Sequence, residues 1–256
     1  MRNGAKNMQA NEVLRLESGG VLSLYVPPKA VRGVVLICPG GGYQWVAPRE
    51  GEPVARAFNA DGWAAAVLEY ACYQGKPLGK LPLKQAGEAM HVLRQRFADM
   101  PALTCGFSAG GHLALSSAVL KIPGEHAQPR PDAVILGYPV ITAGQYAHRG
   151  SFVQLAGSTD PAAQQAFGLE DKITPQTPPV FVWATMEDAT VPVENTLMLV
   201  SALHRAGVPC EAHLFEKGVH GTSISTAEVD QPSRHRHHWV ELAVEWLGDT
   251  FDWSVG

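Results

Sequence analysis

A serine lies at the centre of a Gly-x-Ser-x-Gly pattern at residues 106–110. An apolar stretch typical of a strand precedes the pattern, and a run of small and apolar residues that favours a helix follows it. Strand, tight turn and helix form a nucleophile elbow, in which Ser108 adopts a strained backbone conformation. Gly106 and Gly110 must then lack a Cβ atom, because the helix and the strand would otherwise collide. A glycine-rich loop with an exposed serine is the alternative, which the flanking strand and helix disfavour.

A serine hydroxyl is a weak nucleophile at neutral pH, so it needs a histidine to take its proton and a carboxylate to orient that histidine. After an elbow, the acid precedes the histidine in the chain, and each follows a later strand. Asp188 follows the apolar run 179–184, and His220 lies in a glycine-containing loop after the run 210–215. We therefore predict that Ser108, Asp188 and His220 form a catalytic triad.

Other residues compete for these two roles. Glu187 is the rival acid, but the shorter side chain of Asp188 turns directly off the strand end. Asp160 and Asp171 lie in a less regular segment, where structural or solvent roles are expected. His112 comes one helical turn after the serine, and we expect it to pack or to form hydrogen bonds within the fold.

Three further histidines resemble a metal site at first sight: His235, His237 and His238. They are interleaved with arginines ahead of an apolar helix, and no cysteine or acidic ligand set completes a site. We expect a solvated face there, and neither a metal ion nor a cofactor in the reaction. The four cysteines lack Cys-x-x-Cys spacing and are expected to be buried free thiols. They are Cys38, Cys72, Cys105 and Cys210.

A glycine-rich stretch at residues 39–43 follows the continuous apolar run 33–38, which is typical of a central strand. Glycines let backbone amides approach a ligand closely, as the binding of a developing negative charge requires. We predict an oxyanion hole that combines the amide of Ala109 with amides of Gly41 and Gly42. The sequence leaves open which of the two glycines donates.

Strands and helices must bring these loops together. Residues 12–26 predict an antiparallel hairpin, and strand-like and helix-like runs alternate after it. The predicted strands are 33–38, 63–70, 101–105, 132–139, 179–184 and 210–215, and the predicted helices are 49–58, 82–97, a helix after Ser108, 193–206 and 235–247. This alternation predicts one α/β domain over residues 1–256, with a mainly parallel sheet between helix layers. The weaker pattern at 142–178 predicts short helices in a lid-like insertion over the site.

Composition excludes several classes of partner. The chain has 256 residues and a formal net charge of -4, which gives no basic face for nucleic acid or anionic lipid. Residues 1–13 contain no apolar targeting core, and no stretch reaches membrane-spanning length. We therefore expect a soluble, cytoplasmic protein that acts on a small molecule. Whether an export signal has been removed, and whether the chain forms a homo-oligomer, the sequence leaves open.

Together these motifs resemble the α/β-hydrolase superfamily, and within it the branch of acetyl esterases and acetylxylan esterase-like enzymes. The resemblance is carried by residues 39–43, 50–55, 106–114, 177–185, Asp188 with 191–193, and 218–221. It implies the α/β-hydrolase fold and assigns the triad to Ser108, Asp188 and His220. One departure is Pro39, which stands where many related esterases carry a histidine before the glycines.

The resemblance also implies a function. It indicates a serine carboxylic ester hydrolase that removes short acyl groups, acetyl in particular, from sugars or oligosaccharides. Tyr43 and Trp45 are predicted to offer aromatic surface to a sugar ring, with packing as the alternative. Amide hydrolysis, as in arylformamidases and small serine peptidases, remains a second hypothesis, and a binding module without activity a third. The acyl chain length and the alcohol are not fixed by the sequence.

Overall fold

The computed structural model describes residues 10–29, 31–73, 75–121 and 129–252. Within these residues eight strands form one sheet, in the order β1-β2-β4-β3-β5-β6-β7-β8. The strands are β1 Glu12–Arg15, β2 Val21–Tyr25, β3 Val34–Cys38, β4 Ala64–Glu69, β5 Ala102–Phe107, β6 Val134–Gly137, β7 Val180–Thr185 and β8 Cys210–Phe215.

Strand direction divides the sheet into two parts. The pairs β1–β2 and β2–β4 are antiparallel, with Glu12 opposite Leu24 in the first of them. All other neighbours are parallel, including β3 and β5, in which Cys38 pairs with Gly106. The predicted N-terminal hairpin and the mainly parallel sheet are thus confirmed.

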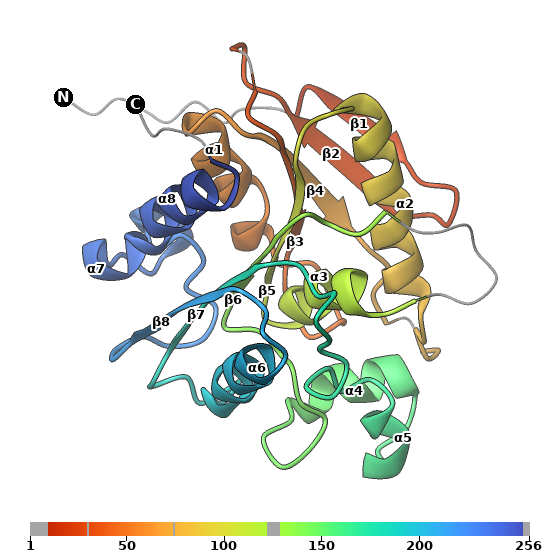
Figure 1. Ribbon diagram of the computed structural model, residues 1–256. Helices are drawn as coiled ribbons and strands as arrows, with labels where there is room; N and C mark the ends of the chain where they lie inside the picture. Colours follow the sequence, from red (N-terminus) through yellow and green to blue (C-terminus); the bar gives the residue numbers. More distant parts are fainter. Residues whose placement is uncertain (1–9, 30, 74, 122–128, 253–256) are drawn as a thin grey trace.

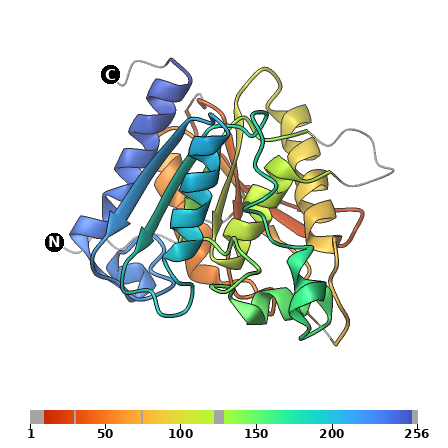
Figure 2. The same ribbon diagram turned by 60° about the horizontal axis from the view of Figure 1, so that its bottom comes forward.

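Helices cover both faces of the sheet (Figures 1 and 2). They are α1 Glu52–Ala60, α2 Leu81–Arg96, α3 Ala109–Val119, α4 Arg149–Ala156, α5 Pro161–Gln165, α6 Glu194–Arg205, α7 Arg234–His237 and α8 Trp239–Thr250. In both views α1 and α8 lie on one side of the sheet, and α2, α3 and α6 lie on the other. Parallel strands need such crossover helices, which explains why helices and strands alternate along the chain.

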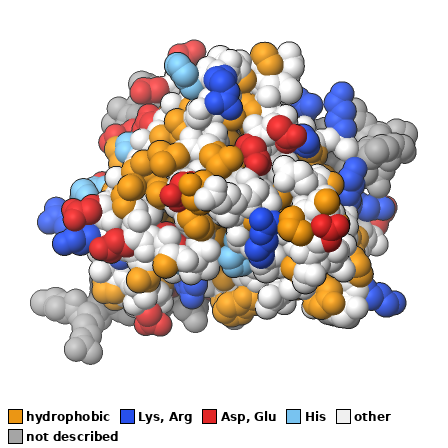
Figure 3. Space-filling model, turned by 90° about the horizontal axis from the view of Figure 1, so that it is seen from below, with side chains coloured by type: hydrophobic (Ala, Val, Ile, Leu, Met, Phe, Trp, Pro, Cys, Tyr) orange, Lys and Arg blue, Asp and Glu red, His pale blue; other side chains and the backbone are white. Residues whose placement is uncertain are grey.

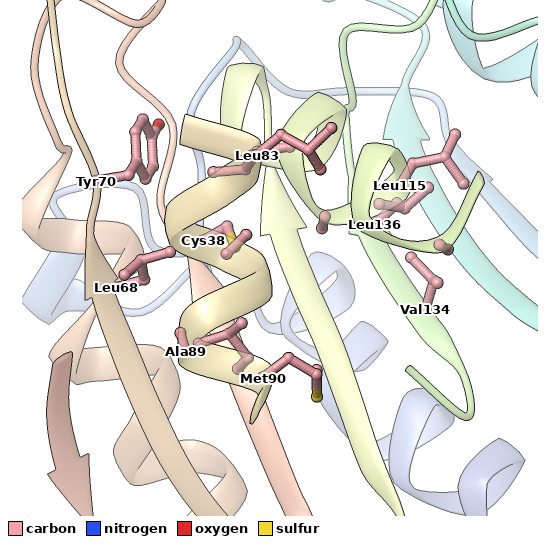
Figure 4. Close-up of a cluster of buried hydrophobic side chains, with 14 of the residues drawn as sticks. Cys38, Leu68, Tyr70, Leu83, Ala89, Met90, Leu115, Val134 and Leu136 are labelled. Atoms are coloured by element: carbon pink, nitrogen blue, oxygen red, sulfur yellow. The ribbon is translucent and has the colours of Figure 1, made fainter. Parts of the chain in front are cut away.

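The central strands are buried on both faces, which explains their continuous apolar runs. Successive residues of a strand point to opposite faces. On β3, Val34, Leu36 and Cys38 join a cluster that includes residues of α2 and α3, whereas Val35 and Ile37 join a second cluster with residues of α1 and α8. Figure 4 shows the first cluster, with side chains from α2 and α3 above the strands.

The second cluster is rich in aromatic side chains. Trp183 of β7 stacks on Trp239 of α8, with ring centroids 5.3 Å apart. Phe107, at the end of β5, contacts Trp239 edge to face. Trp183 is therefore a packing residue of the core. These contacts fix the end of β5, from which the elbow projects.

The loops that follow the parallel strands meet at one edge of the sheet. This edge lies at the bottom of Figure 1, where α4 and α5 are also found, and Figure 3 shows the same face from below. Charged, apolar and histidine side chains are mixed on it. In α/β folds the carboxyl ends of the strands are where ligands bind.

The segment 142–178 packs at this edge. Phe152 of α4 meets the ring of His112 on α3, and the carbonyls of Gln154 and Leu155 accept hydrogen bonds from the loop before α2. Among the described residues of this segment, His148 alone lines the cleft described below. The insertion therefore supplies one residue of the cleft wall, while α4 packs against α3 and the loop before α2.

Two helix boundaries differ from the sequence-based expectation. The first predicted helix begins as a turn of 3-10 helix, Pro48–Glu50, and α1 follows from Glu52. The last one is divided at His238 and continues to Thr250. No helix of the described residues is long and apolar enough to cross a membrane. The prediction about a targeting segment at residues 1–13 falls largely outside the described residues.

Candidate active site

The elbow at Ser108 has the expected geometry. Ser108 stands between β5 and α3 with φ 53° and ψ -122°, a region that residues with a side chain rarely adopt. A Cβ atom on Gly106 would lie 2.2 Å from the carbonyl oxygen of Gly110, and one on Gly110 would lie 2.0 Å from that of Cys38. Both neighbours are backbone atoms that cannot move aside. The prediction that both positions must lack a Cβ atom is therefore confirmed.

Three predicted residues meet at this elbow. Nε2 of His220 lies 2.8 Å from Oγ of Ser108, and Nδ1 lies 2.6 Å from Oδ2 of Asp188. A carboxylate can only accept, so Nδ1 carries a proton and Nε2 is free to accept the serine proton. The arrangement is a continuous chain from carboxylate to imidazole to hydroxyl.

The carboxylate of Asp188 is itself held in place. Its other oxygen, Oδ1, accepts hydrogen bonds from the amides of Thr190 and Val191, both at 2.9 Å. The rival Glu187 is exposed, and its Oε2 accepts the amide of Gly218 at 3.0 Å. Asp188 therefore orients the imidazole, while Glu187 ties down the loop that carries it.

The glycine-rich loop after β3 lies beside Ser108 and lines the same cleft. Gly41 and Gly42 have φ values of 122° and 65°, and a Cβ atom on Gly41 would lie 2.2 Å from the carbonyl oxygen of Trp45. Between described residues, no hydrogen bond uses the amide of either glycine. The amide of Ala109, the first residue of α3, has no partner within its helix. These three amides, together with the positive end of α3, suit an anion.

Gly40 differs from the next two glycines. Its amide donates to Oε2 of Glu50 at 2.6 Å and is not available to a substrate. Gly41 and Gly42 are therefore the glycines of this stretch that have a positive φ and whose amides bond to no other described residue.

A cleft of about 270 Å³ opens beside Ser108. Its lining combines polar and apolar groups and consists of Gly41, Gly42, Gln44, Trp45, Ala47, Arg49, Glu50, Ser108, His148, Thr190 and His220. The side chain of Trp45 is 57% exposed, so it offers a free aromatic surface at the mouth of the cleft.

Tyr43, by contrast, does not line this cleft, and the prediction that it contacts substrate is wrong. Its side chain is buried, and its hydroxyl lies 2.7 Å from Nδ1 of His112. A left-handed backbone, with φ 60°, accompanies this inward orientation. The packing alternative is the one that the structure supports.

His112 is a structural histidine, as expected. Its Nε2 lies 2.7 Å from the carbonyl oxygen of Phe167 and donates to it, so Nδ1 accepts from Tyr43. Burial lowers the pKa of His112 to about 4, which keeps the ring neutral. The residue links α3 to the glycine-rich stretch 39–43, which we call the oxyanion loop, and to the segment 142–178.

The three histidines near the C-terminal helix make separate contacts. His237 bonds to the carbonyl oxygen of Ile224 at 2.6 Å, and His238 pairs with Glu241 on the surface. His235 packs edge to face on Phe215. Among the described residues no cluster of histidine, cysteine and acidic side chains could hold a metal ion.

All four cysteines are free thiols. Cys38 and Cys105 are buried as expected, whereas Cys72 and Cys210 are half-buried. Burial raises the pKa of the Cys38 thiol to about 12, so it is not a nucleophile at neutral pH.

Six residues of the cleft lining were not predicted as site residues from the sequence: Gln44, Ala47, Arg49, Glu50, His148 and Thr190. Glu50 belongs to a charged segment that has the pattern of a solvated helix start, yet its side chain is only 1% exposed. His148 precedes α4, and its Nδ1 bonds to Oγ of Ser151 at 2.8 Å. Glu50 begins the segment 50–55 that contributes to the resemblance, but nothing in that segment assigned its side chain a role in the site. His148 lies in no such motif, so the sequence offered no signal for its position.

Comparison with known proteins places the chain in a family. Residues 88–252, well over half of the chain, match the prolyl oligopeptidase family. Endo-1,4-beta-xylanase B of Butyrivibrio fibrisolvens is 36% identical over 213 residues, which are 77% of this chain and 33% of that protein. An acetylxylan esterase of Xylanibacter ruminicola is 26% identical over 214 residues, which are 79% of this chain and 43% of that protein. The chain thus spans less than half the length of these two relatives.

A solved structure covers more of the fold. The acetyl ester-xyloside bifunctional hydrolase of Caldicellulosiruptor lactoaceticus superposes with a TM-score of 0.82 at 31% identity, over 92% of this chain and 90% of that one. The chain therefore belongs to the prolyl oligopeptidase family and has the fold of an α/β-hydrolase.

Proposed function

We propose that the chain is a serine carboxylic ester hydrolase that removes short acyl groups, acetyl in particular, from sugars or oligosaccharides. The observation that carries this proposal is the hydrogen-bonded chain from Asp188 through His220 to Ser108. It ends at the cleft that Gly41 and Gly42 line, and between described residues no hydrogen bond uses the amides of Gly41, Gly42 or Ala109. Nucleophile, base, orienting acid and anion-binding amides are the parts that acyl transfer requires.

The reaction follows from this geometry in two steps. Oγ of Ser108 attacks the ester carbonyl while Nε2 of His220 takes the hydroxyl proton, and the negative oxygen of the tetrahedral intermediate faces the three amides. The intermediate then expels the alcohol, which receives the proton from His220. Water repeats the sequence on the acyl-serine, releasing the carboxylic acid and restoring the serine. Each amide that binds the oxyanion contributes about 3 kcal/mol to the lowering of the barrier.

The nature of the cleft supports a short acyl group and a polar alcohol. Its volume is about 270 Å³, and Gln44, Arg49 and Thr190 place polar groups along it. The exposed ring of Trp45 suits the apolar face of a sugar. The names of two similar proteins, an acetylxylan esterase and an acetyl ester-xyloside hydrolase, agree with such a substrate.

The decisive experiment compares ester substrates of increasing acyl length. We expect p-nitrophenyl acetate to be hydrolysed faster than the butyrate, and the octanoate to be poor. Acetylated xylo-oligosaccharide should release acetate, and a fluorophosphonate probe should label Ser108 in the wild type but nothing in Ser108→Ala. Absence of both labelling and ester turnover would refute the proposal and favour a binding module.

Hydrolysis of amides is the second candidate function. It is favoured by the match to a family named for a peptidase, since the same serine and histidine can cleave an amide. N-formylkynurenine and a prolyl p-nitroanilide should be assayed beside p-nitrophenyl acetate. A kcat/KM that is higher for either amide than for the ester would reverse the order of the two candidates.

A further inference from the structure

Glu50 is a buried acid in the candidate site that the reaction above does not use. It ends the 3-10 turn Pro48–Glu50, lines the cleft and is 1% exposed. Burial raises the pKa of its carboxyl group, against the effects of Tyr138, Gly40, Arg49 and His220, which lower it. A buried carboxylate is costly unless its oxygens are well satisfied, so its partners indicate why it is there.

Each oxygen of Glu50 has a donor from a different loop. Oε2 accepts the amide of Gly40 at 2.6 Å, and Oε1 accepts the hydroxyl of Tyr138 at 2.8 Å. Because both partners donate, the ionised carboxylate satisfies them both. One side chain therefore joins the end of β3 to the end of β6.

The bond to Gly40 acts on the oxyanion loop. A Cβ atom on Gly40 would lie 2.7 Å from Oε2 of Glu50 and 2.9 Å from Cβ of Ser108, so Gly40 is packed closely against both the carboxylate and the elbow. Gly40 directly precedes Gly41 and Gly42. Fixing the amide of Gly40 therefore fixes the peptide that leads into the two proposed donors.

The bond to Tyr138 acts on the loop after β8 that carries His220 and Ser223, which we call the histidine loop. The hydroxyl of Tyr138 accepts the amide of Ser223 at 2.9 Å, and its ring packs edge to face on the ring of His220 with centroids 4.9 Å apart. Tyr138 and Ser223 both have positive φ, 39° and 47°, a conformation that these contacts must hold. Oγ of Ser223 also donates to the carbonyl oxygen of Arg49 at 2.6 Å, next to Glu50.

We propose that Glu50 is a positioning residue for the ester hydrolysis proposed above: through Gly40 and Tyr138 it holds the oxyanion loop and the histidine loop at a fixed separation around Ser108. It takes no part in the proton transfer between Ser108 and His220. Its effect is on geometry, and displacement of a reacting group by about 1 Å can lower a rate about 100-fold.

The test uses two conservative variants and a control. Glu50→Gln keeps the shape but cannot accept both donors, and Tyr138→Phe removes only the hydroxyl. Glu52→Gln is the control, because Glu52 lies in the same segment but bonds to Arg56 on the surface of α1. Steady-state kinetics on p-nitrophenyl acetate, the rate of labelling by a fluorophosphonate and the melting temperature should be measured for each, with active sites counted by the label.

We expect Glu50→Gln to lower kcat about 30-fold and Tyr138→Phe about 10-fold, with KM nearly unchanged, because misplacement affects the transition state. The double variant should be little worse than Glu50→Gln alone, since the two residues act in one chain. The labelling rate should fall in parallel, and Glu52→Gln should behave as the wild type.

A purely structural role would give another pattern. The melting temperature would fall while kcat per labelled site stayed at the wild-type value, and that result would overturn the proposal. Strictly additive losses would also contradict it. A wild type that neither hydrolyses the ester nor reacts with the label would refute the proposed function instead. If the wild type is labelled without turning over the ester, the labelling rates alone decide the role of Glu50.

Discussion

The candidate site has a floor and a rim that are built differently. The floor consists of Ser108, Glu50 and Asp188. These residues are at most 6% exposed, and each of their side-chain oxygens has a hydrogen-bond partner. The rim consists of Gln44, Trp45, Arg49 and Thr190, whose side chains are exposed and have no side-chain hydrogen bond among the described residues. The side chains of the floor are thus held in place before substrate binds, whereas the exposed side chains of the rim can adjust to it.

This difference has a physical origin. Floor residues project from strand ends or from turns packed against the sheet, so the cost of ordering them is met during folding. Rim residues lie on loops or, for Arg49, on the exposed side of the 3-10 turn Pro48–Glu50, and their side chains lose conformational freedom when substrate binds. Changes in the floor should therefore reduce kcat, and changes in the rim should alter KM and substrate preference.

The largest loss of activity is expected for Ser108→Ala, a substitution in the floor. It removes the nucleophile, and we expect kcat on p-nitrophenyl acetate to fall about 100,000-fold. Ser117→Ala is a matched control, because among the described residues its hydroxyl bonds only to the carbonyl oxygen of Ala114 within α3. Activity that persists in Ser108→Ala would show that another group attacks the ester.

Asp188→Asn should cause the next largest loss of activity. The amide would present the wrong partner to Nδ1 of His220 and favour the wrong tautomer, so kcat should fall about 10,000-fold. Glu187→Gln, beside it in the chain, should retain most of the activity, because Glu187 contacts the amide of Gly218 instead. Equal losses in the two variants would remove the distinction drawn here between the two acids.

The backbone under the floor can be tested with Gly110→Ala. The new methyl group would lie 2.0 Å from the carbonyl oxygen of Cys38, so α3 or β3 must shift, at a cost of about 3 kcal/mol in the free energy of unfolding. Urea denaturation would measure it. Gly150→Ala, where the nearest atom is 3.4 Å away on the side chain of His148, should change stability little.

His112 links α3 to Tyr43 and to the segment 142–178, and its titration should be visible in stability. Burial lowers its pKa from 6.5 to about 4, so the unfolded chain binds a proton between these values that the folded chain does not. The free energy of unfolding should thus be unaffected by this group above pH 6.5. It should fall by roughly 3 kcal/mol as the pH decreases from 6.5 to 4.

Urea unfolding at several pH values would detect this loss. The variant His112→Gln has no group that titrates at position 112, so its stability should depend less on pH in this range, although it is less stable at pH 7. The same pH dependence in the wild type and the variant would mean that other groups are responsible.

The smallest effect is expected at the rim. Trp45→Ala should raise KM for acetylated xylo-oligosaccharide about 10-fold, which corresponds to the loss of one aromatic contact. Its kcat on p-nitrophenyl acetate should stay close to that of the wild type, since the small ester does not need the ring. A fall of kcat on both substrates would show that Trp45 supports the reacting groups, and the distinction between floor and rim would not hold for this residue.

Much of the fold and part of the site could be predicted from local sequence. Continuous apolar runs such as 34–38 mark strands buried on both faces, and the elbow glycines mark a turn that excludes a Cβ atom. The order of Ser108, Asp188 and His220 follows from the connectivity of such a sheet. Each of these signals lies within a few residues or depends only on chain order.

The remaining features depend on which distant residues meet. Tyr43 and Trp45 are near neighbours with similar chemistry, yet Tyr43 turns inward to His112 and Trp45 remains exposed. Glu50 belongs to a charged segment, but Gly40 and Tyr138 surround it. The direction of a side chain on a loop is set by the partners that burial brings to it, and these lie as many as 88 residues away.

By itself, therefore, the sequence determined the chemistry: a serine on a strained turn, an acid and a histidine at later strand ends, and glycines that leave amides free. Only the tertiary structure decided which side chains support that chemistry and which face the substrate. The reason is that strand, turn and helix patterns are local, whereas burial and hydrogen-bond partners arise when loops far apart in the chain are packed at one edge of the sheet.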